Sequence, residues 1–163
     1  MNDETTTVTE RTAAPGSALA DLRARRDKAK EALHLDLRVP RLPGAPVYVR
    51  FGPVPRAVIE DANKRAAESK DRDWAVIANA FVLAHCCIGV YAEVDGKPQG
   101  SPDTWPKFDA DLAEILGLPT DSNATTIIRG LYLAEGDIIA AAETLSRWSA
   151  QVEQRAAEEF SGN

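Results

Sequence analysis

Residues 74–91 read WAVIANAFVLAHCCIGVY and carry no Asp, Glu, Lys or Arg. Drawn as a helix, the first part of this stretch is apolar on nearly all sides, with Trp74 and Phe81 on one face and Ala80 on another. A helix that is apolar all round is surrounded by protein. The sequence therefore predicts a central buried helix, with Trp74 in the core, that runs into a short strand at residues 90–94.

The same stretch is nearly long enough to cross a membrane. It contains the polar residues Asn79 and His85, which favour a core helix over a membrane span. We therefore expect no membrane partner.

Two short segments before this helix alternate between apolar and polar residues. Their apolar positions are Leu35, Leu37, Val39, Val47, Val49 and Phe51. Alternation with a period of two is typical of a strand with one buried face, and the stretch 40–46, PRLPGAP, is rich in turn residues. The pattern predicts a β-hairpin, and because two strands alone are marginally stable, its apolar face should cover helices.

The other segments show helical periodicity and helix-ending residues. We expect helices at about 55–69, up to 116, from 121 or 122 to 136, and from 137 to about 160. Ile115 should point inward, and Gly136 should end its helix. The predicted fold is α+β, a mostly helical single domain with a small antiparallel β-hairpin packed on the central buried helix.

The expected organisation has three parts: a flexible tail at 1–16, an amphipathic basic helix at 17–33, and the α+β domain at 34–160. The charge is divided unevenly along the 163 residues, whose formal net charge is −6. Residues 1–75 hold 14 basic and 12 acidic side chains, whereas residues 76–163 hold 5 and 13. An acidic half argues against nucleic-acid binding, which needs clustered positive charge, and suits basic partners.

The motif His85-Cys86-Cys87 is the only one that invites a metal or a nucleophile. Neighbouring residues on a helix point about 100° apart, so that three in a row do not converge on one ion. We interpret the motif as a core histidine beside two buried, reduced thiols, the state typical of a cytosolic protein. The sequence predicts no catalytic residue, no metal and no cofactor.

Aromatic side chains are the candidates for partner contact, because they are enriched at the centres of interfaces. Trp148 follows Arg147 on the last helix and is the best of them, with Phe160 second.

The order of these segments is similar to that of a known protein family. A hairpin at 33–54 reads LHLDLRVPRLPGAPVYVRFGPV, and the central helix and strand follow at 74–91. The turn DGK at 95–97 and the helix GDIIAAAETLSRW at 136–148 complete the pattern. Over roughly residues 34–155 the chain resembles the tail assembly chaperones of long-tailed phages that infect actinobacteria.

The resemblance implies a non-enzymatic protein that binds the tape-measure protein during tail assembly in the cytoplasm of the infected host. It also implies absence from the finished virion, and a second, longer product made by ribosomal frameshifting. That longer form and the tail-tube protein are further partners to expect. The alternative is a structural protein retained in the virion, either a head–tail connector or a tail-completion component.

Overall fold

The computed structural model describes residues 18–69 and 73–162. The chain divides into two units, Met1–Leu33 and His34–Asn163, which we describe separately. In the first unit, helix α2 (Leu22–Ala32) contains no buried residue, and Arg25 pairs with Asp21 at 3.2 Å. The predicted tail at 1–16 and the predicted helix start at residue 17 lie outside the described residues.

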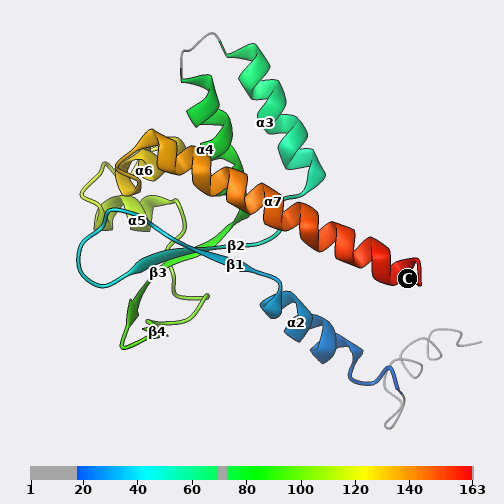
Figure 1. Ribbon diagram of the computed structural model, residues 1–163. Coiled ribbons are helices and arrows are strands. Elements are labelled where there is room, and N and C mark those ends of the chain that lie inside the picture. The colour runs from blue at the N-terminus through cyan, green and yellow to red at the C-terminus, as the bar shows by residue number, and fades with distance from the viewer. Residues whose placement is uncertain (1–17, 70–72, 163) are drawn as a thin grey trace, which may run out of the picture. The chain divides into compact units, whose positions relative to one another are not determined.

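The second unit has an α+β fold, as the sequence predicts. Its sheet contains β1 (Leu35–Arg38), β2 (Val47–Phe51), β3 (Cys87–Val94) and β4 (Lys97–Pro98), in that spatial order and antiparallel throughout (Figure 1). The predicted hairpin is therefore confirmed, and β3 and β4 extend it. Asp95 and Gly96 join these two strands with φ values of 54° and 73°, the left-handed backbone that a tight hairpin turn needs.

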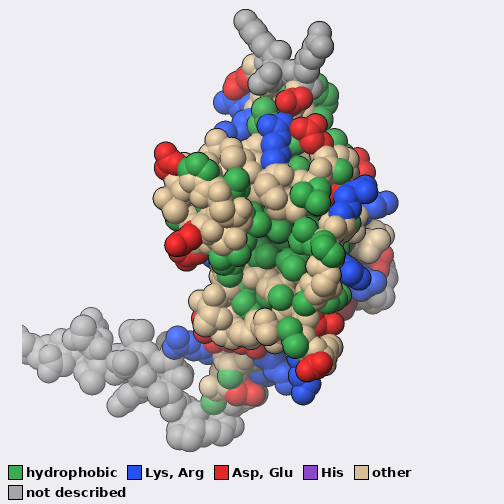
Figure 2. Space-filling model, turned by 90° about the vertical axis from the view of Figure 1, so that its left-hand side faces the viewer, with side chains coloured by type: hydrophobic (Ala, Val, Ile, Leu, Met, Phe, Trp, Pro, Cys, Tyr) green, Lys and Arg blue, Asp and Glu red, His purple; other side chains and the backbone are tan. Residues whose placement is uncertain are grey.

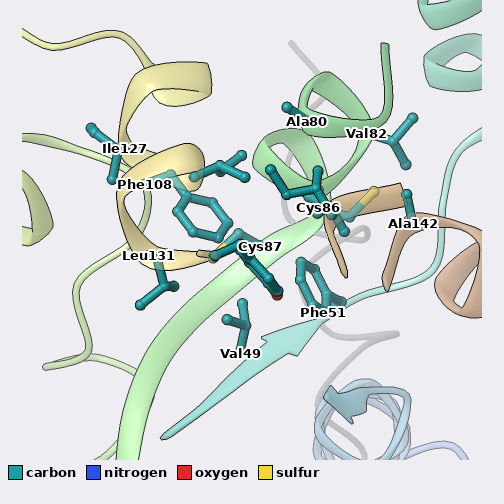
Figure 3. Close-up of a cluster of buried hydrophobic side chains, with 14 of the residues drawn as sticks. Val49, Phe51, Ala80, Val82, Cys86, Cys87, Phe108, Ile127, Leu131 and Ala142 are labelled. Carbon is teal, nitrogen blue, oxygen red and sulfur yellow. The ribbon is translucent and has the colours of Figure 1, made fainter. Parts of the chain in front are cut away.

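Five helices accompany the sheet in the described part of this unit. They are α3 (Arg56–Glu68), α4 (Trp74–Cys86), α5 (Ala110–Ile115), α6 (Ala124–Leu131) and α7 (Glu135–Phe160). Helix α4 packs against α3, α6 and α7, and its Ala80 and Leu83 are fully buried. The expected central helix is confirmed. Cys86 ends it, and Cys87 begins β3 without a connecting loop (Figure 3).

Outside α5, three sequence expectations about single residues are wrong. Trp74 is 50% exposed rather than in the core, because the first turn of α4 projects beyond α7 (Figure 1). His85 is exposed as well, and its ring lies beside that of Phe81, 6.1 Å between centroids. Gly136 does not end a helix: α6 already ends at Leu131, where the next residue is extended, and Gly136 lies in the first turn of α7.

One side of α7 is buried, and it includes one polar residue, Ser149, which is 3% exposed. The backbone N–H of Val54 donates a hydrogen bond to the Ser149 hydroxyl oxygen at 2.8 Å. Val54 lies in the connection between β2 and α3, which has no strand or helix of its own to satisfy this N–H. Ser149 therefore fixes that connection against α7.

We expect Ser149→Ala to destabilise the protein by about 1–3 kcal/mol, because it leaves the buried Val54 N–H without an acceptor. Urea unfolding followed by circular dichroism measures the change. The control is Glu143→Ala, an exposed position on the same helix, which should change the free energy of unfolding by less than about 0.5 kcal/mol. Equal effects of the two substitutions would contradict this role for Ser149.

Candidate partner-binding groove

An open apolar groove lies between the sheet and α5. Val47 on β2 and Val90 and Ala92 on β3 line it from the sheet, on the side that faces the helices. Tyr91 on β3 also lines it, and the remaining lining residues come from the β1–β2 connection, the stretch before α5, α5 with its C-cap, and α6: Leu42, Pro106, Leu112, Ile115, Leu116 and Leu131. The hollow measures about 310 Å³. Figure 2 shows the apolar area in the middle of this face.

Helix α5 forms one wall of the groove although it is only six residues long. Asp109 caps its start by accepting hydrogen bonds from the backbone N–H groups of Asp111 and Leu112. Gly117, with φ 72°, closes its end. These caps hold the short helix in place, so its side chains have fixed directions.

Ile115 is the residue that sequence reasoning misplaced in this helix. It was expected to point inward, but it is 70% exposed and lies at the rim of the groove. Leu112 and Ala113 are the buried contacts of α5, and a helix this short has no second turn to bring Ile115 under cover. The sequence does show an isoleucine at the end of a short helix. The helical period alone, however, does not tell whether such a residue lines a groove or is buried in the core.

The groove presents side chains to a partner, and its strand β3 has no free edge with which to pair. One edge of β3 pairs with β2, and its other edge is also occupied: the Val90 N–H donates to Pro106 O at 2.7 Å, and the Gln99 N–H donates to Ala92 O at 2.9 Å. Adding a strand needs unpaired backbone groups. None of the residues lining the groove is charged. The groove can therefore cover apolar side chains of a partner, and it cannot extend its own sheet into that partner.

On the opposite face of the sheet, side chains of the strands and of Trp105 contact one another. Arg50 donates two hydrogen bonds to the Asp36 carboxylate, at 2.7 and 3.0 Å, and its guanidinium lies over the Trp105 ring. Trp105 stacks on Tyr91, and a Cβ added to Gly89 would meet the Trp105 Cβ at 2.6 Å. Burial, together with Asp36, raises the pKa of Tyr91 to about 12. The polar groups here bind one another, which leaves this face without an open site.

The two cysteines are buried and unbridged, as the sequence predicts. Burial raises the pKa of the Cys86 thiol to about 11 and that of the Cys87 thiol to about 12. In residues 18–69 and 73–162, no three His, Cys, Asp or Glu side chains are grouped to hold a metal ion. The same residues include no helix long and apolar enough to span a membrane.

The two residues predicted to contact a partner lie outside the groove. Trp148 is half-buried and packs against the core, whereas Phe160 is 96% exposed at the last residue of α7. Twelve residues of helix separate them by about 18 Å along the axis, so they do not form one surface. Their role in binding stays a prediction.

Because both thiols are buried, we expect them to react slowly with thiol reagents. At pH 8, where roughly one Cys86 thiol in a thousand is ionised, we expect neither cysteine of the folded protein to react quickly with Ellman's reagent. Both should react at once after unfolding in urea, as followed by the absorbance of the released thiolate. Rapid reaction of one thiol in the folded chain would show that a cysteine is accessible and activated.

No protein-family model, curated protein or solved structure matches this chain.

Proposed function

We propose that this chain is a non-enzymatic tail assembly chaperone, which binds the phage tape-measure protein in the cytoplasm of the infected host. The observation that carries the proposal is the open apolar groove between β3 and α5. The resemblance of residues 34–155 to such chaperones supports this choice of partner, and the groove supports a binding role because it exposes apolar side chains. We propose the frameshifted longer form of this chain and the tail-tube protein as further partners.

The physical task suits a groove of this kind. A very long helical protein exposes apolar stripes that aggregate until other subunits cover them. A groove lined by aliphatic side chains removes part of such a stripe from water, and each buried Leu or Ile contributes roughly 1.5–3 kcal/mol. The costs of association offset much of this gain, so each contact is weak and reversible. Reversible binding is what a chaperone needs, because the tail-tube subunits must later replace it.

Ile115 provides the sharpest test, since it is exposed and its substitution leaves the core intact. We expect the wild-type chain to keep a coexpressed tape-measure protein in the soluble fraction, and Ile115→Glu to lose most of this effect because a carboxylate enters the apolar groove. The matched control is Ile59→Glu, at an exposed isoleucine on α3 that does not line the groove. Soluble tape-measure protein is measured by immunoblot after centrifugation.

Two results would contradict the proposal. One is a folded wild-type chain that leaves the tape-measure protein insoluble. The other is the presence of this chain in purified virions in amounts comparable to structural subunits, measured by mass spectrometry, which would favour a head–tail connector or a tail-completion protein.

A further inference from the structure

We infer that the groove selects a partner helix whose apolar stripe is bordered, on the flank facing α5, by lysine or arginine residues. This inference rests on the proposed function, because it names the chemistry of the segment that the groove would hold. Three features of the structure lead to it: the lining of the groove, the charges on α5, and the pairing of Arg41.

The lining requires a helical partner. A bound chain in extended form would place its backbone N–H and C=O groups against aliphatic side chains, where they find no hydrogen-bond partner. The edges of β3 are already occupied, so they do not satisfy such groups. A helix satisfies its own backbone and presents apolar side chains three and four residues apart. It is therefore the form of chain that can enter this groove without leaving buried polar groups unpaired.

The rim of the groove beside α5 is acidic, although the lining itself is uncharged. Residues 108–128 contain four acidic side chains and no Lys or Arg. Asp111 precedes Ile115 by four residues, and so lies beside it on the helix surface, and Glu114 is its immediate neighbour in sequence. Both carboxylates are exposed, and neither forms an ion pair with any described residue. This rim therefore attracts positive charge on a bound segment.

The cation beside Leu42, on the β1–β2 connection, does not cancel this attraction. Arg41 donates a hydrogen bond to the Asp137 carboxylate at 2.6 Å, and this bond raises the pKa of the arginine. Its charge is thus balanced by a carboxylate of α7. Lys107, next to the lining residue Pro106, adds one positive charge in this region, and the two carboxylates of α5, Asp111 and Glu114, outnumber it.

The test uses two synthetic peptides of about 18 residues, long enough to form a helix in part. They share one leucine stripe and differ only in carrying Lys or Glu beside it. Fluorescence anisotropy measures their binding to the full-length chain at low salt. The variants are Ile115→Glu, which blocks the groove, and the pair Asp111→Lys with Glu114→Lys. The pair Glu158→Lys with Glu159→Lys, near the end of α7, changes the net charge equally and is the matched control.

We expect the Lys peptide to bind the wild-type chain about tenfold more tightly than the Glu peptide, since several exposed charges change from attraction to repulsion. The α5 pair should abolish or invert this preference, the α7 control should keep it, and Ile115→Glu should weaken both peptides. Equal binding of both peptides, or a preference unchanged by the α5 pair, overturns the inference. The coexpression assay tests the chaperone function separately. If the peptides show no charge preference but the tape-measure protein stays soluble, only the inference about charge is refuted.

Discussion

The burial of one uncharged stretch, residues 74–91, is the constraint on which the rest of the structure depends. Helix α4 and strand β3 follow each other without a loop, because Cys87 turns extended directly after Cys86. The two elements thus share one core (Figure 3). The hairpin β1–β2 pairs with β3, and α3, α6 and α7 pack around α4. Every larger element of the second unit is therefore positioned by contact with this stretch.

The groove is a consequence of the same arrangement. Strand β3 is eight residues long and continues beyond Val90, and its Ala92 lines the groove together with Leu131 of α6. The short helix α5 covers only part of the remainder, so Val94 is 41% exposed and Ile115 stands at the rim. On the other side of the sheet, Trp105 packs directly on Gly89 and closes the surface. One face is thus sealed by an aromatic ring, and the other is left open for apolar contact.

Local patterns predicted much of the fold and little of the groove. The strand alternation, the Asp95-Gly96 turn and the long last helix follow from periodicity and turn chemistry, because each depends on neighbours in sequence. Trp74 and Ile115 were misplaced because apolar character does not tell which face of a helix another element will reach. The groove unites side chains from six segments between Leu42 and Leu131. Only tertiary packing brings these segments together, so no single stretch contains its signature.

An exposed apolar groove also invites self-association, and the acidic rim limits it. A symmetric dimer through this face whose two-fold axis passes close to α5 would bring α5 of one copy near α5 of the other. Asp111 and Glu114 would then face like charges, and like-charge contact at an interface disfavours the pairing. A helix with basic residues beside its apolar stripe meets the same rim with attraction. The arrangement therefore discriminates between copies of this chain and a basic partner through charge, while the apolar lining supplies the binding energy for either.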